Sequence, residues 1–118
     1  MRRPSLPKWL MRILFDNGTP DALRAHLREH QVTFARHIGW ERLVNGNLLR
    51  AAEDAGFDLL LTTDKNIRYQ QNLAGRKIAL VVLGNQQWPV ARLHVEKIVT
   101  TVNGSTPGSY VEVEIPFR

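Results

Sequence analysis

Short, mainly apolar runs recur along this chain, and they restrict its fold more than any other feature. They cover residues 11–15, 57–63 and 78–83 and are separated by polar or helix-like segments. Apolar runs of this length are typical of strands that are covered on both faces of a sheet. Between the first two runs, Leu23 and Leu27 have the spacing of one helix face. This alternation predicts an α/β fold with a parallel sheet.

The remaining elements follow from local signals. Thr19 before Pro20 predicts a helix N-cap, and Gly56 predicts the end of a helix over 47–55. We expect a weaker strand over 31–35, a polar helix over 67–73 and a longer helix over 89–102. Residues 36–46 are expected to be mostly loop. In 110–115 polar and apolar residues alternate, with Val111, Val113 and Ile115 on one side, which predicts an edge strand.

The length, composition and charge of the chain restrict the classes of protein to which it can belong. The chain has 118 residues, enough for one domain, which we place at 11–118 after a basic tail at 1–10. It has no cysteine and no apolar run of about 18 residues, which favours a cytoplasmic protein without membrane contact. Its net charge of +5 suits either a polyanion partner such as RNA or a merely solubilising surface.

Two aspartates stand at equivalent places, directly after apolar runs: Asp16 and Asp64. The carboxyl ends of parallel strands share one edge of a sheet, where ligands of open α/β folds bind. Two carboxylates there suit Mg²⁺ or Mn²⁺, although each aspartate could instead cap the helix that follows. Asp21 and Glu41 are secondary candidates for the same edge. Asp58, which opens its strand, belongs to the opposite edge, as do Glu53 and Asp54 at the end of their helix.

The segment 62–72 is polar for the start of a helix. Thr62 or Thr63 is placed to hydrogen-bond a water or a phosphate, Arg68 to contact phosphate and Tyr69 to stack on a base. The alternative is the solvated face of a surface helix. His26 and His30 are four residues apart, but we interpret them as exposed helix residues and not as a metal pair. Trp40 and Trp88 are expected to pack in the core.

Three segments resemble the PIN-like family, in its small branch that is often encoded with toxin–antitoxin modules. They are Met11–Pro20, the pair Gly39-Trp40 with the stretch Asn45–Leu49, and the stretch Phe57–Ile67 running into Tyr69–Leu73. The resemblance implies a single-domain, three-layer α/β/α fold with a mostly parallel central sheet of about five strands. It also implies RNA hydrolysis with Mg²⁺ or Mn²⁺ held by Asp16 and Asp64. Many relatives carry an acid at the position of Asn47, which we place in the catalytic set as an amide.

The residues expected to bind substrate around this site are Asn17, Thr63, Lys65, Asn66, Arg68 and Tyr69. The leading hypothesis is a metal-dependent endoribonuclease that is the toxin of a toxin–antitoxin pair, with RNA and an antitoxin protein as partners. The neutral Asn47 motivates a rival: a weak or inactive module that binds RNA or a protein. A phosphate-accepting receiver domain ranks lower, because Asn17 stands where a second acid is needed. The alternating last strand also makes a homodimer an expectation.

Overall fold

The computed structural model describes residues 10–67 and 75–116. Its strands are β1 (Arg12–Phe15), β2 (Gln31–Phe34), β3 (Leu59–Thr62), β4 (Ala79–Leu83) and β5 (Tyr110–Val113). Its α-helices are α1 (Asn45–Asp54), α3 (Trp88–Ala91) and α4 (Val95–Asn103), and its 3-10 helices are η1 (Asp21–His26), η2 (Ala35–Ile38) and η3 (Arg92–His94). Almost all of the tail predicted at 1–10 and of the helix predicted at 67–73 lies outside the described residues.

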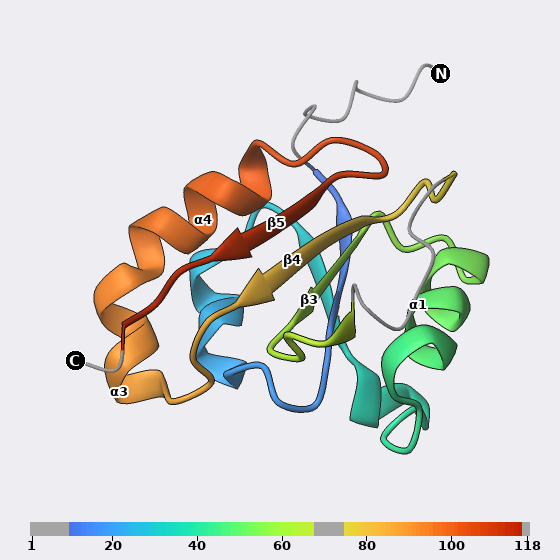
Figure 1. Cartoon of the computed structure of the whole chain (residues 1–118), viewed down its shortest axis with the longest axis horizontal. Helices are drawn as coiled ribbons and strands as arrows, with labels where there is room; N and C mark the ends of the chain where they lie inside the picture. Colours follow the sequence, from blue (N-terminus) through green and yellow to red (C-terminus); the bar gives the residue numbers. More distant parts are fainter. Residues whose placement is uncertain (1–9, 68–74, 117–118) are drawn as a thin grey trace, which may run out of the picture.

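The five strands form one parallel sheet in the order β2-β1-β3-β4-β5 (Figure 1). Phe15 of β1 is level with Phe34 on one side and with Leu61 on the other. Every residue of β3 and β4 is buried, as their apolar runs predict. The predicted parallel sheet of about five strands is confirmed, with β5 at an edge. Because all strands point the same way, their carboxyl ends lie along one rim of the sheet.

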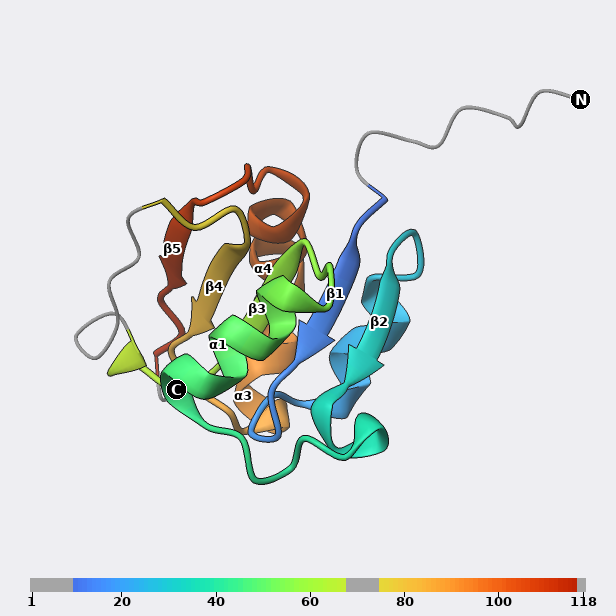
Figure 2. The ribbon, with the colours of Figure 1, turned by 90° about the vertical axis from the view of Figure 1, so that its right-hand side faces the viewer.

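Helices cover both faces of the sheet, which gives three layers (Figure 2). Alternate strand residues point to opposite faces. Ile13 and Phe15 pack with η1, α3 and α4, whereas Leu14 packs on the other face with α1. The expected packing roles of Trp40 and Trp88 are confirmed, since each packs against one of the two cores. The sheet is thus fixed on both sides, and only its rims and edges are left for other groups.

Helix α1 ends as its glycine predicts. Gly56 has a φ of +84°, a left-handed conformation that favours glycine. The Gly56 N–H donates to the carbonyl of Glu53 at 3.1 Å, and the Phe57 N–H donates to that of Ala52 at 3.0 Å. This pair of bonds is a Schellman motif, which satisfies the last carbonyls of the helix and turns the chain into β3.

Two predictions about helices are wrong in detail. Thr19 does not cap η1: its buried hydroxyl donates to the carbonyl of Leu61 at 2.9 Å, and Pro20 occupies the cap position. The tertiary bond to β3 outcompetes the local one. The single helix expected over 89–102 is instead the succession α3, η3 and α4, in which His94 leaves the helical region with a φ of −121°.

His30 is not an exposed helix residue, contrary to our prediction, although His26 is exposed. Helix η1 ends at His26, and His30 stands just before β2 with 7% of its surface exposed. Its Nδ1 accepts the Met11 N–H at 3.0 Å, so its Nε2 donates to Oδ1 of Asn103 at 2.7 Å. The ring therefore joins the start of β1 to the end of α4.

The last strand follows its predicted alternation only in part. Val113 and Ile115 are buried, but Val111 is 38% exposed because β5 is an edge strand.

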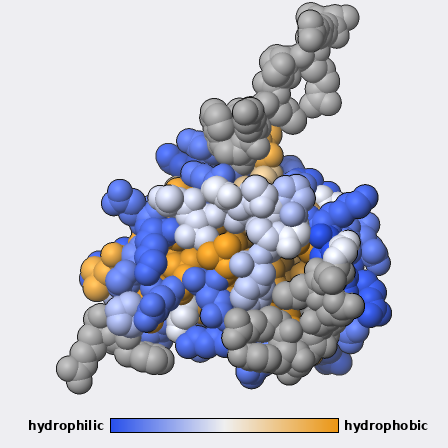
Figure 3. Space-filling model, turned by 45° about the horizontal axis from the view of Figure 1, so that its top comes forward, coloured by the Kyte–Doolittle hydropathy of each residue, from blue (hydrophilic) through white to orange (hydrophobic). Residues whose placement is uncertain are grey.

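The face of the molecule that Figure 3 shows is mostly hydrophilic, with an apolar area in its middle. In the described part of the chain, no helix has the length and apolar character that a membrane crossing requires.

Candidate functional site at the carboxyl rim

Asp16 is held at the rim between β1 and β3. It follows the last residue of β1, and its backbone N–H donates to the carbonyl of Leu61 at 3.0 Å. Its own carbonyl accepts the Thr19 N–H at 3.0 Å, which closes the turn into η1. Asp64 lies two residues beyond β3, and β1 and β3 are neighbours. The sheet thus brings both predicted aspartates to the same rim, as the sequence predicts.

A single buried hydroxyl links the two aspartates. Thr62 is 0% exposed; its Oγ1 donates to Oδ2 of Asp16 at 2.6 Å and accepts the N–H of Asp64 at 3.1 Å. The Asp16 carboxylate and the Asp64 backbone are therefore two hydrogen bonds apart. A short bond from a hydroxyl to a carboxylate is a strong, charge-assisted one. Thr62 consequently fixes the orientation of Asp16 relative to the loop that carries Asp64.

Each aspartate also stabilises its own turn. Oδ1 of Asp16 accepts the Asn17 N–H at 2.6 Å, and Oδ1 of Asp64 accepts the Asn66 N–H at 3.0 Å. The bond from Asp64 to Asn66 closes a local turn, whereas the helix that Asp64 could cap lies almost entirely outside the described residues. Asp16 does not cap η1, because Pro20 occupies that position. Both aspartates are partly exposed, so these local bonds leave them accessible from solvent.

Of the two other acids that we considered for the rim, only Asp21 has a side-chain partner among the described residues. Asp21 forms a two-point ion pair with Arg36, at 3.1 Å and 2.5 Å. Hydrogen bonding to Asp21, together with the negative charge of Asp21, raises the pKa of the Arg36 guanidinium above its ordinary value. Glu41 is exposed, and its backbone carbonyl accepts a hydrogen bond from the side-chain Nδ2 of Asn17 at 2.8 Å. Asn17 thus fastens the loop after β1 to the segment before α1.

The acids assigned to the opposite edge lie there. Oδ2 of Asp58 accepts the N–H of Arg12 at the start of β1, at 2.8 Å. Glu53 accepts the Lys77 N–H at 2.6 Å, just before β4. Chiefly through that bond, the pKa of Glu53 is lowered from its ordinary value. Both are structural carboxylates at the amino edge of the sheet.

Those predicted substrate-binding residues that the structure describes lie in loops at the carboxyl rim. Thr63, Lys65 and Asn66 follow β3, and the last two are exposed. A Cβ on Gly18 would be 2.7 Å from Oγ1 of Thr63, so the loops after β1 and β3 touch. Asn47 is exposed in the first turn of α1. Arg68 and Tyr69 lie outside the described residues.

Sequence reasoning missed a third loop at this rim, the one after β4. The same Cβ on Gly18 would be 3.3 Å from Oε1 of Gln86, so this loop also adjoins the rim. Asn85 is 5% exposed; its Oδ1 accepts the Gln87 N–H at 2.8 Å, but its Nδ2 has no partner among the described residues. A buried amide without a partner is rare and costly. The signal was present, because Asn85 follows an apolar run almost as Asp16 and Asp64 do.

The carboxylates of Asp16 and Asp64 suit a hard cation whose remaining ligands are water and substrate phosphate. Among the described residues, no three His, Cys, Asp or Glu side chains are grouped so that they could hold a metal ion by themselves. Magnesium commonly uses one or two protein carboxylates and takes its remaining ligands from water and substrate phosphate. Asp16 and Asp64 supply such a pair of carboxylates, whereas a closed protein cage is not available in this part of the chain.

Comparison with known proteins provides no relative: no family model matches the chain, and neither the curated proteins nor the solved structures contain a significant match.

Proposed function

We propose that this chain is a Mg²⁺- or Mn²⁺-dependent endoribonuclease with its site at Asp16 and Asp64. The observation that carries the proposal is the hydroxyl of Thr62, which joins the Asp16 carboxylate to the Asp64 backbone. The net charge of +5 supports RNA as the substrate, because a basic protein attracts a polyanion.

Each residue of the proposed site has a role that follows from its position at the rim. When bound, a divalent cation neutralises charge on a phosphodiester and acidifies the attacking water. Asp16 and Asp64 are the residues that would hold the cation, and Thr62 keeps Asp16 from rotating away. Lys65 and Asn66 are exposed on the loop after β3, where they meet the phosphate backbone of an RNA strand. The amides of Asn17 and Asn47 orient water or phosphate without adding charge.

The resemblance to the toxin-type branch of the PIN-like family extends the proposal. On that basis the chain is the toxin of a toxin–antitoxin pair, with a cognate antitoxin as protein partner. The lack of cysteine supports a cytoplasmic protein, and the alternating last strand supports a homodimer. The toxin and antitoxin proposals rest on the motifs at 11–20 and 57–67.

One observation favours a second candidate, a weak or inactive module that binds RNA or protein. The described residues contain no group of three acids, and Asn47 is neutral where many members of the resembled family carry an acid. Calorimetric titration with Mg²⁺ or Mn²⁺ separates the candidates. Binding that disappears in Asp16→Asn supports the nuclease, whereas no binding at millimolar metal supports the module. Cleavage gained only in Asn47→Glu also supports the module.

The decisive test is cleavage of a labelled RNA in the presence of Mg²⁺. We expect Asp16→Asn and Asp64→Asn each to lower the rate by about 100-fold or more, since each removes a carboxylate that would hold the cation. The matched control is Asp54→Asn, the same chemical change at an exposed residue of α1 that we assign to the opposite edge. It should cleave like the parent. A folded Asp16→Asn/Asp64→Asn double variant that still cleaves would refute the proposal.

A further inference from the structure

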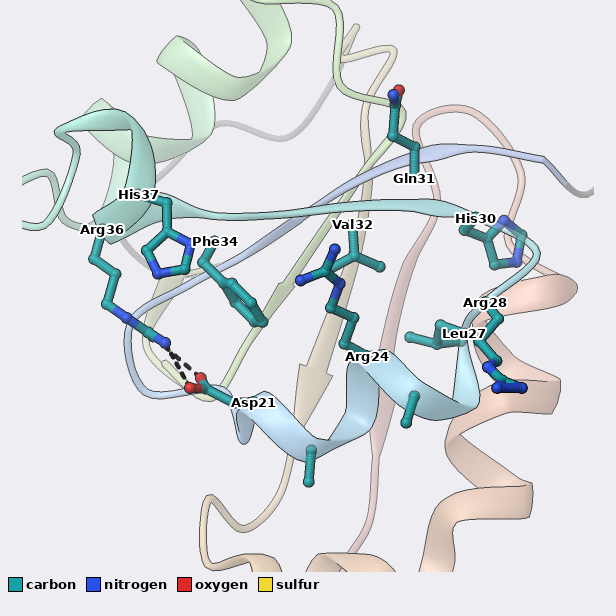
Figure 4. A pocket seen from close by; sticks show the side chains of 12 residues that line it. Asp21, Arg24, Leu27, Arg28, His30, Gln31, Val32, Phe34, Arg36 and His37 are labelled. Atoms are coloured by element: carbon teal, nitrogen blue, oxygen red, sulfur yellow. Dashed lines mark hydrogen bonds and ion pairs between the residues drawn. The ribbon is translucent and has the colours of Figure 1, made fainter.

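A groove of about 760 Å³ lies between β2 and η1 (Figure 4). Neither Asp16 nor Asp64 lines it. Strand β2 is one edge of the sheet, and among the described residues it pairs only with β1. Val32 and Phe34 of β2 line the groove on one side, and Arg24 and Leu27 line it on the other. Figure 4 shows Arg24 reaching from η1 toward β2. The groove thus combines an open strand edge with a basic wall.

The register shows which backbone groups β2 offers to this edge. The Gln31 N–H donates to the Met11 carbonyl at 2.9 Å, and Gln31 lies opposite Arg12. In parallel pairing, a strand directs the N–H and C=O of alternate residues to the same neighbour. Gln31 and Thr33 therefore face β1, whereas the N–H and C=O of Val32 point outward. No strand in the described part of the chain takes up this outer edge. An exposed edge of this kind is a template for one more strand.

The charge of the groove is positive and only partly balanced. Arg36 is paired with Asp21. Arg24 and Arg28 are exposed, and the ion pairs among the described residues include neither of them. The Arg24 guanidinium lies 5.6 Å from the centre of the Phe34 ring, which holds it over the apolar floor. Two arginines beside an open strand fit an extended ligand that carries carboxylates or phosphates.

The aromatic residue of the groove distinguishes a peptide from a nucleic acid. Single-stranded RNA binds through exposed aromatic faces on which its bases stack. Phe34 is only 7% exposed; Arg36 lies 4.8 Å above its ring, and Phe15 and His37 pack edge-on against it. It therefore has no face left for a base. The outward-pointing amide and carbonyl of Val32, which pair with no other described strand, match a peptide backbone, which carries the same groups at the strand repeat.

We propose that the β2 edge and its groove bind an extended acidic segment of a partner protein. The segment adds to the sheet beside β2, its backbone pairs with Val32, and its carboxylates pair with Arg24 and Arg28. This site is separate from the Asp16–Asp64 rim, so the proposal stands or falls independently of RNA cleavage.

The test uses a dye-labelled Glu-Val-Glu-Val-Glu-Val peptide and measures fluorescence anisotropy at low salt. We expect saturable binding that is weakened about tenfold or more in Arg24→Glu/Arg28→Glu, because the charge contacts become repulsive. The control is Arg50→Glu/Arg92→Glu, which reverses two exposed arginines outside the groove and should bind like the parent. A Lys-Val-Lys-Val-Lys-Val peptide should not bind.

Two further measurements test the strand pairing without depending on a variant that folds. N-methylation of alternate amides of the acidic peptide, in each of the two registers, should weaken binding about tenfold in one register only. Binding should also slow the hydrogen exchange of the Val32 amide, measured by NMR. Unchanged exchange at Val32, equal binding of the basic peptide or full affinity in Arg24→Glu/Arg28→Glu would overturn the proposal. Tighter binding of oligouridylate that is lost in the same variant, or association of this chain with itself through β2, would also overturn it.

Discussion

Replacing Thr62 by valine tests whether its hydroxyl holds the rim together. Valine has nearly the shape of threonine but can neither donate to Asp16 nor accept from the Asp64 N–H. A methyl group cannot remain where the hydroxyl lies, 2.6 Å from Oδ2 of Asp16, so the carboxylate must move. Thr62→Ser is the matched control, because it keeps the hydroxyl and removes the methyl group instead.

The size of the effect follows from the two bonds that are lost. A hydrogen bond to a charged group contributes about 1.5–3 kcal/mol and a neutral one about 0.5–1.5 kcal/mol. Asp16 is partly exposed, so water replaces part of the first bond, and we expect Thr62→Val to lose about 2–3 kcal/mol of unfolding free energy. Thr62→Ser should lose only about 1 kcal/mol for the buried methyl. For a domain of this size, 1 kcal/mol corresponds to about 4 °C in Tm.

Urea unfolding of the parent and both variants at pH 7 measures these free energies. If the proposed function is right, the same pair of variants also separates in RNA cleavage, where Thr62→Val should be slower by about 10- to 100-fold and Thr62→Ser should stay close to the parent. A Thr62→Val variant as stable as Thr62→Ser would refute the idea that the hydroxyl joins the two loops.

Two further predictions concern the opposite edge of the sheet. Glu53→Gln should be less stable than the parent at pH 7, because the folded state lowers the pKa of Glu53. The difference in unfolding free energy should shrink as the pH falls below the ordinary pKa of 4.5 and through the lowered pKa. Urea unfolding at several pH values measures it. If the difference stays constant with pH, the carboxylate of Glu53 is not responsible. Gly108→Ala should lower the free energy of unfolding by about 2 kcal/mol or more, because Gly108 has a φ of +76° and a Cβ there would lie 2.6 Å from the Arg76 carbonyl oxygen. A Tm within about 2 °C of the parent would contradict this.

The strands were predictable because their signal is local. A strand covered on both faces needs apolar residues at consecutive positions, and the runs at 57–63 and 78–83 contain β3 and β4 to within about two residues. The shared rim of Asp16 and Asp64 was predictable for the same reason, since parallel strands must end on the same side. Asp58 and Glu53 were placed at the opposite edge by the same reasoning.

The errors arose where distant residues compete with local signals. Thr19 carries a good N-cap side chain, but its hydroxyl bonds to Leu61, 42 residues along the chain. His30 has the spacing of a helix face relative to His26, but the helix ends at His26. The ring of His30 instead forms hydrogen bonds with Met11 and Asn103. No local pattern contains these partners.

By itself, the sequence determined the class of fold, the direction of the strands and the pair of aspartates at one rim, because these follow from short apolar runs and from the helix-like segments that separate them. Only the tertiary structure decided the strand order, which leaves β2 open at an edge, and the choice of Thr62 as the hydroxyl between the aspartates. Both depend on which strands become neighbours. Neighbouring strands are selected by the packing of α1 on one face and of η1, α3 and α4 on the other, and that packing joins residues too far apart for any local pattern to record.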